Sequence, residues 1–188
     1  PMCSSKKIKN KISLLRALME KTGIDAFLIT HDDEYLLENT HKSNQRLKWI
    51  IGFSGSAGFL VVSKLNLYLF VDGRYTLQSK IETKGIKVKI LNINEVINFN
   101  YFNDKAEKIK NFGVYTKSLS YDYYYKLFSN AKEAKINIVN LNINLIDQIW
   151  KRNTKKQKTK KIFTLEKKYC DVAFSEKISQ VKKYISKE

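Results

Sequence analysis

The chain has 188 residues, of which 43% are hydrophobic and 12% aromatic, so it can form one globular core with room for the first helix of a second domain, and disorder throughout is excluded. Its 35 Lys and Arg outnumber 18 Asp and Glu, a net charge of +17, but lysine is spread over segments of every kind together with Asn and Ile, as in proteins from AT-rich genomes. No apolar run could cross a bilayer, and Cys3 and Cys170 lack metal-ligand spacing, which predicts a soluble cytoplasmic protein.

The first third of the chain is predicted to alternate between helix and strand. Apolar residues at helical spacing predict a first helix that begins near Ser4 or Ser5 and ends at Gly23. The short apolar run at 25–30 predicts a buried strand, and a polar loop then leads into a short helix that ends near Ile51. This order indicates an α/β domain.

The middle of the chain continues the same alternation. Two paired strands are predicted at 58–62 and 67–71, joined by a turn at 63–66. After them we expect, in chain order, a helix at 75–83, a strand at 86–91, short helices at 95–99 and 105–110, a strand at 112–115, a helix at 121–132 and a strand at 136–141 that closes the sheet.

The last part of the chain changes in composition. Residues 151–161 contain seven basic residues in eleven, and a charge run of this kind is usually solvated, so we expect a basic linker at 151–165 between a domain at 1–150 and a second, truncated domain at 166–188. Ser175 is the expected cap of a helix that runs to Ile185. The basic run with Tyr169 nearby leaves an alternative, a stand-alone basic binding module for nucleic acid or an acidic partner.

Six potential metal ligands crowd one loop: His31, Asp32, Asp33, Glu34, Glu38 and His41. Their spacing fits no defined metal site. We therefore expect a polar loop in which Asp33 caps a turn or the next helix, and no metal.

Ser54 and Ser56 lie among glycines, a setting found in nucleophile elbows and phosphate loops. The Gly-x-Ser-x-Gly register is not met and no lysine follows as in a P-loop. These serines are therefore predicted to belong to a structural turn, and no catalytic residue is expected.

The strand after the glycine turn ends in Asp72, Gly73, Arg74 and Tyr75. An arginine beside an aspartate is either a structural ion pair or a guanidinium offered to a carboxylate. Asp72 and Tyr75 are the expected supporting residues in both cases.

These motifs resemble the Xaa-Pro aminopeptidases (aminopeptidase P), whose non-catalytic first domain is also found in creatinase and prolidase. The resemblance covers roughly the whole chain, with Tyr115 and Thr116 replacing an aspartate and a proline of the family. It rests on the stretches Trp49-Ile50-Ile51-Gly52-Phe53-Ser54-Gly55-Ser56-Ala57-Gly58, Asp72-Gly73-Arg74-Tyr75, Asn144-Leu145-Ile146-Asp147-Gln148-Ile149-Trp150 and Ser175-Glu176-Lys177-Ile178.

The resemblance implies a mixed β-sheet with helices on both faces. It also implies that Arg74 contacts substrate in the cleft of a peptidase domain that this sequence lacks. In the family that domain holds two divalent metal ions, usually manganese, on two aspartates, one histidine and two glutamates. The expected partners are therefore the peptidase domain, a peptide with proline at its second position and, in the full-length enzyme, further copies of the chain.

Overall fold

The computed structural model describes residues 5–102, 107–152 and 163–187. The chain divides into two compact units, Pro1–Arg152 and Asn153–Glu188. Most of the expected basic linker at 151–165 lies outside the described residues, so the linker remains a prediction. So do residues 105 and 106 of the helix expected at 105–110.

A six-stranded mixed sheet forms the centre of the first unit, as predicted. Its strands are β1 (Ala26–Thr30), β2 (Gly58–Ser63), β3 (Leu67–Val71), β4 (Lys89–Asn92), β5 (Asn111–Val114) and β6 (Asn137–Asn140). The spatial order is β4-β3-β2-β1-β5-β6, with β2 antiparallel to both β1 and β3 and the other three neighbouring pairs parallel. The expected hairpin is β2 and β3, whose turn is closed by Ser63 and Asn66.

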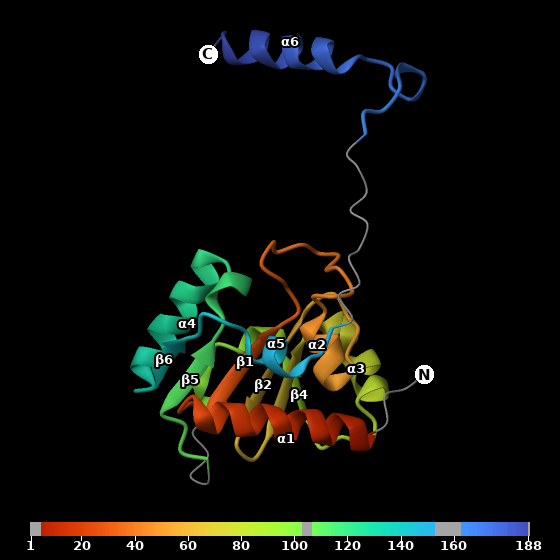
Figure 1. The fold of residues 1–188 in the computed structure, drawn as a ribbon. Coiled ribbons are helices and arrows are strands. Elements are labelled where there is room, and N and C mark those ends of the chain that lie inside the picture. The colour runs from red at the N-terminus through yellow and green to blue at the C-terminus, as the bar shows by residue number, and fades with distance from the viewer. Residues whose placement is uncertain (1–4, 103–106, 153–162, 188) are drawn as a thin grey trace. The chain divides into compact units, whose positions relative to one another are not determined.

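Helices cover both faces of this sheet (Figure 1). One face packs against α1 (Ser5–Lys21), α2 (Arg46–Ile51) and α5 (Leu145–Ile149). The opposite face packs against α4 (Tyr121–Glu133), the 3-10 turn Phe99–Phe102 and Val96, which follows the 3-10 turn Ile93–Glu95. The α/β class with helices on both faces is therefore confirmed.

The burial of the central strand β1 shows why helices pack on both faces of the sheet. All five of its residues are buried, and successive side chains of a strand point to opposite faces. Phe27 and Ile29 accordingly enter the core under α1, whereas Ala26 and Leu28 enter the core under α4.

Three local expectations were wrong. The short 3-10 turns stand where a helix was expected at 95–99, and residues 107–110, the described part of the helix expected at 105–110, are not helical. The helix α5 was not predicted, because its five residues are too few to show a helical period. The last helix, α6 (Phe174–Ile185), begins two residues earlier than a cap at Ser175 predicts, with Ala173 at its N-cap.

The carboxyl ends of β1, β3 and β5 lie along one edge of the sheet, beside the start of the antiparallel β2. We call this the loop edge. The loop of residues 31–45, the turn Gly73–Tyr75 before α3 (Thr76–Glu82), and the turn Thr116–Ser118 before α4 all follow these strand ends. Loop 31–45 and the start of α4 are both at the top of the first unit in Figure 1.

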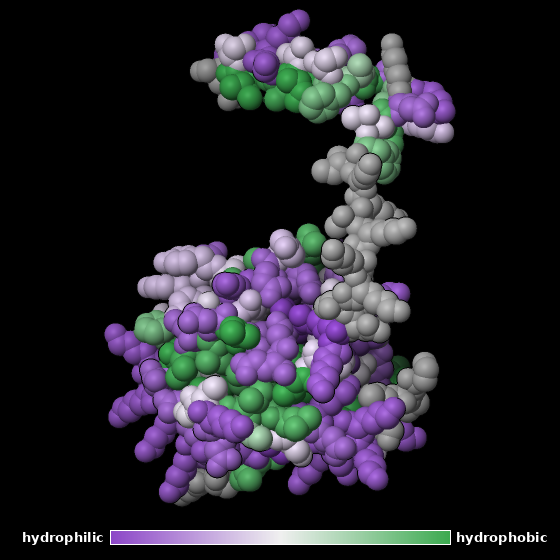
Figure 2. All heavy atoms as spheres, viewed as in Figure 1, coloured by the Kyte–Doolittle hydropathy of each residue, from purple (hydrophilic) through white to green (hydrophobic). Residues whose placement is uncertain are grey.

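The described part of the second unit contains one short 3-10 turn, Lys167–Tyr169, and α6. Apolar residues follow one side of α6 (Figure 2), and Ile178, Val181 and Ile185 are exposed by 39%, 53% and 70%. Among the described residues, no helix combines the length and the apolar run needed to span a membrane.

Candidate functional site

The glycine turn between α2 and β2 is closely packed. Gly52 ends α2 at φ +87°, a left-handed conformation that glycine adopts without strain. A Cβ on Gly55 would lie 2.4 Å from Cζ of Phe53 and 2.9 Å from the ring of Tyr75. Phe53 and Tyr75 meet edge to face with their ring centroids 6.0 Å apart. Glycine is therefore needed at 55 because the rings of Phe53 and Tyr75 leave no room for a Cβ.

The two serines of this turn bind protein groups. Ser54 donates from its backbone N–H and its hydroxyl to the carboxylate of Glu82, at 2.9 and 2.5 Å. The hydroxyl of Ser56 lies 2.7 Å from the hydroxyl of Tyr75. These bonds tie the turn to α3 and to Tyr75, as expected for a structural turn.

Arg74 lies at the loop edge, beside its aspartate. Its Nε donates to Oδ1 of Asp72 at 2.9 Å, and the same oxygen accepts the backbone N–H of Arg74. The side chains of Arg74 and Asp72 are 73% and 34% exposed. The hydrogen bond from Arg74 lowers the pKa of the Asp72 carboxyl from its ordinary value. The guanidinium is thus oriented at one nitrogen, and most of its surface is accessible.

Tyr75 contacts both Arg74 and the glycine turn. Its ring faces the guanidinium of Arg74 at 5.5 Å and closes over Gly55. Asp72, Arg74 and Tyr75, selected together from the sequence, are brought together at the end of β3. What Arg74 contacts in a larger assembly remains a prediction.

A second arginine, Arg46, is almost fully buried at the same edge, with 3% of its side chain exposed. It donates from Nε and Nη2 to the two oxygens of Asp147, both at 2.8 Å, and from Nη2 to Oε1 of Glu34 at 2.6 Å. The hydroxyl of Tyr115 donates to Glu34 at 3.0 Å, and Arg152 donates to Asp147. We call these five residues the Arg46 network.

Proton affinities in the Arg46 network follow from these contacts. Burial alone would raise the pKa of the Glu34 carboxyl, but hydrogen bonds and charge from Arg46 hold it below its ordinary value. Burial and the bond to Glu34 raise the pKa of the Tyr115 hydroxyl. The Glu34 carboxyl is therefore ionised and the Tyr115 hydroxyl neutral near neutral pH, and the network connects loop 31–45 to α2, β5 and α5.

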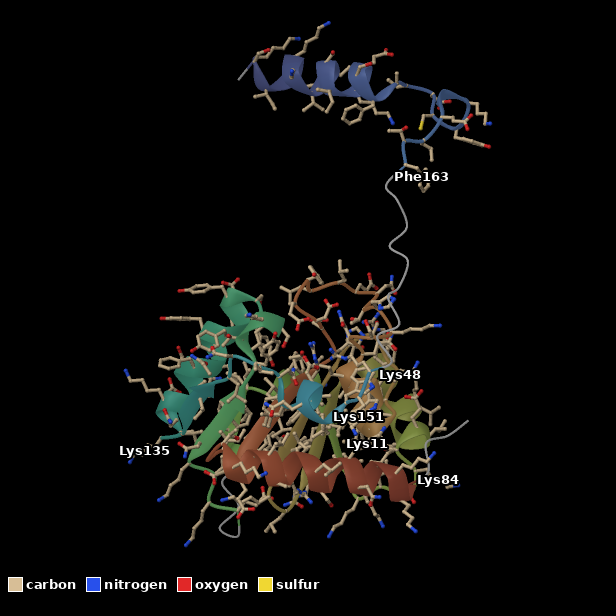
Figure 3. The ribbon with its side chains drawn as sticks, viewed as in Figure 1. Lys11, Lys48, Lys84, Lys135, Lys151 and Phe163 are labelled. Carbon is tan, nitrogen blue, oxygen red and sulfur yellow. The ribbon has the colours of Figure 1, made fainter. Side chains whose placement is uncertain are left out.

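Two stacked tryptophans lie next in the chain to residues near the Arg46 network. Trp49 and Trp150 lie 5.4 Å apart with nearly parallel rings, and the ammonium of Lys11 lies 4.3 Å from the centroid of the Trp49 ring. Figure 3 labels Lys11, Lys48 and Lys151, which come from α1, α2 and the residue after Trp150. The stack and Arg152 together fix the place where the chain leaves the first unit.

Most of the six possible ligands in loop 31–45 have partners other than a metal. Asp33 accepts the backbone N–H of Tyr35 and the side-chain amide of Asn44, both at 3.0 Å. His31 bonds to Asp32, and Glu34 belongs to the Arg46 network. Within the described ranges, no group of three or more His, Cys, Asp or Glu side chains could hold a metal ion. Asp33 caps a turn, as the sequence predicted.

The sequence did not identify the Arg46 network. In the sequence, Glu34 falls among possible metal ligands, and Asp147 stands out only as part of a family motif. One signal was available: Arg46 stands one helical turn before Ile50 in a helix whose other buried residues are apolar. An arginine on a buried face requires a carboxylate partner.

The profile of the Creatinase/Prolidase N-terminal domain family matches residues 11–149. A probable Xaa-Pro aminopeptidase P of Coprinopsis cinerea is 28% identical over 95% of this chain and 29% of its own length. Xaa-Pro aminopeptidase 2 of Rattus norvegicus is 24% identical over 93% of this chain and 26% of its own length. The chain thus spans less than a third of these relatives.

Two solved structures share the fold. The X-prolyl aminopeptidase of Caenorhabditis elegans, described as a cytosolic enzyme with a di-nuclear active site, superposes with a TM-score of 0.75 at 21% identity, over 96% of this chain and 31% of its own. The isolated N-terminal domain of the peptidase PepQ from Mycobacterium tuberculosis gives 0.59 at 19% identity, over 75% of this chain and 98% of its own. With the profile match over most of its length, the chain belongs to the creatinase/prolidase N-terminal domain family and is an N-terminal domain of the kind found in Xaa-Pro aminopeptidases.

Proposed function

We propose that this chain is the non-catalytic N-terminal part of a metal-dependent aminopeptidase that removes a residue preceding proline. In this proposal the domain forms a wall of the substrate cleft and restricts access to peptide N-termini. It also supports contacts between copies of a homo-oligomeric cytoplasmic enzyme.

The observation that carries the proposal is Arg74. The relatives support the reaction class, and the exposed guanidinium, oriented by Asp72 at the loop edge, supports a specific contact. A guanidinium held at one nitrogen keeps its remaining donors for a carboxylate or a carbonyl oxygen of a peptide. In this role Arg74 binds and orients the peptide, and Asp72 and Tyr75 position Arg74.

Metal chemistry is assigned to another part of the enzyme. The described residues contain no suitable ligand group, so we place the two divalent ions, with manganese the expected metal, in a peptidase region outside the matched domain. When bound, such ions activate a water as the nucleophile. The 188-residue chain alone is therefore expected to bind substrate weakly and to cleave nothing.

The alternative of a basic binding module has less support. The relatives named above are described as peptidases, and the basic run at 151–161 falls mostly outside the described residues.

The test is the substitution Arg74→Ala in a longer polypeptide that contains this domain and the peptidase region. We expect kcat/KM on an Xaa-Pro tripeptide to fall about tenfold to a hundredfold, which corresponds to roughly 1.4 to 2.8 kcal/mol of lost transition-state stabilisation. Lys84→Ala, which removes a cation at the end of α3, is the matched control and should leave kcat/KM unchanged. Unchanged kinetics for Arg74→Ala would remove Arg74 from the substrate contacts.

A further inference from the structure

The tip of loop 31–45 exposes three consecutive large apolar side chains. Tyr35, Leu36 and Leu37 are exposed by 74%, 46% and 52%. Leu36 also has φ +52°, in the left-handed region that leucine seldom adopts. Exposed apolar clusters and local backbone strain both occur at interaction sites.

The tip is held firmly although its side chains are exposed. Asp33, only 1% exposed, accepts the N–H of Tyr35 through its carboxylate, and its carbonyl accepts the N–H of Leu36 at 3.2 Å. Glu34, the next residue, is held by Arg46. A segment fixed in this way has lost most of its conformational freedom before any partner arrives, which lowers the cost of binding.

A hollow of about 280 Å³ lies beside the tip. Its apolar surface is formed by Leu36, Leu119 and the stacked rings of Phe59 and Tyr123, whose centroids are 5.1 Å apart. Asp32 and Ser120 lie at its polar side. Small-molecule sites usually measure about 300–1,000 Å³, so the hollow suits a protein side chain better than a cofactor.

The buried hydroxyl of Tyr123 in this hollow lacks a hydrogen bond. It is shielded from solvent and has no hydrogen-bond partner among the described residues. A buried hydroxyl without an acceptor costs about 1–3 kcal/mol. A backbone carbonyl entering the hollow with an apolar side chain would satisfy it.

The place where the first unit ends indicates which partner enters the hollow. Arg152, the last residue of the first unit, bonds to Asp147, and Asp147 bonds to Arg46, which holds Glu34 next to the tip. Polypeptide that follows Arg152 is therefore tethered at the edge that carries the tip and the hollow. A tethered partner is present at an effective concentration that a free partner rarely reaches.

We infer that residues 35–37 and the hollow beside them form a docking surface for the peptidase region of the same polypeptide, which inserts one apolar side chain and offers a carbonyl oxygen to Tyr123. This inference rests on the proposed function. It assigns the loop edge, rather than the faces covered by α1 and α4, as the side that meets the peptidase.

Hydrogen exchange tests the inference by comparing the 188-residue chain with the longer polypeptide. We expect amides at 34–37 and 119–123 to exchange about tenfold more slowly in the longer polypeptide. Leu36→Asn should abolish that added protection, and Tyr123→Phe should reduce it. Asn tolerates positive φ, so the Leu36 variant of the 188-residue chain should melt no lower than the parent.

The matched control is Leu65→Asn, which replaces a 61% exposed leucine in the β2–β3 turn at the opposite edge and should leave the protection intact. Equal exchange in the two lengths overturns the inference. So does protection that appears in the 188-residue chain alone at high concentration, because that result indicates a second copy. If the longer polypeptide cleaves the Xaa-Pro tripeptide but its amides at 34–37 and 119–123 gain no protection, only the docking surface is overturned. If those amides are protected but the longer polypeptide does not cleave the tripeptide, the proposed function is overturned.

Discussion

Arg46 and Arg74 both pair with aspartates, but they differ in burial. The Arg46 side chain is 3% exposed and is bound by two carboxylates, whereas the Arg74 side chain is 73% exposed and is bound by one. Removing a partner from a buried pair leaves an uncompensated charge, while an exposed pair contributes little. The first arginine therefore stabilises the fold, and the second is available for binding.

Arg46→Met should lower the free energy of unfolding of the 188-residue chain by about 3 to 5 kcal/mol, because Glu34 and Asp147 lose the charge between them. Arg74→Ala, which removes an exposed ion pair, should change the free energy of unfolding by no more than about 1 kcal/mol. Urea unfolding of both variants measures the difference. Equal losses for the two arginines would show that burial does not separate their roles.

The hairpin β2–β3 and its flanking turns are the elements that place Arg74. The glycine turn precedes β2, and Gly73–Tyr75 follows β3. Tyr75 joins the two turns through Ser56 and through the space left by Gly55. The position of Arg74 thus depends on a glycine that lies nineteen residues earlier in the chain.

Gly55→Ala should therefore destabilise the chain by about 1–3 kcal/mol, because its Cβ would overlap Phe53 and Tyr75. Gly73→Ala is the matched control, since a Cβ there meets nothing within 4 Å, and it should cost at most about 0.5 kcal/mol. Thermal melts of the two variants provide the comparison. A Gly55 variant as stable as the Gly73 variant would mean that the turn can relax.

At the scale of the whole molecule, carboxylates join distant strands of a strongly cationic chain. Asp25, before β1, bonds to Lys64 at 2.6 Å and accepts the backbone N–H groups of Lys110 and Asn111 at 2.9 Å. Burial alone would raise its pKa, but Lys64 and these N–H groups lower it from the ordinary value. Glu34 has a lowered pKa as well.

A carboxyl whose pKa is lower in the folded state contributes stability above its unfolded pKa, and that contribution is lost as pH falls through the folded pKa. Asp25→Asn should therefore lower Tm at pH 7, and the gap from the parent should close as pH falls from about 4 towards 2. Melts across this pH range measure it, with the exposed Glu20→Gln as control. A gap that stays constant with pH would exclude the ionised carboxylate as its cause.

The sequence alone determined the features that depend on near neighbours. The helical stripe of α1, the hairpin and the pairing of Arg74 with Asp72 involve residues that are close in the chain, so local periodicity and turn chemistry predict them. The motif around Gly52 and Gly55 also indicated the family, which the profile match confirms.

Only the tertiary structure decided which distant polar residues meet. Arg46 and Asp147 are 101 positions apart, and nothing in the local pattern of either segment specifies the other. The hollow at Tyr123 likewise needs β2, loop 31–45 and the start of α4 at one edge. Strand order and the closure of long loops bring such groups together, and packing of the whole sheet fixes both.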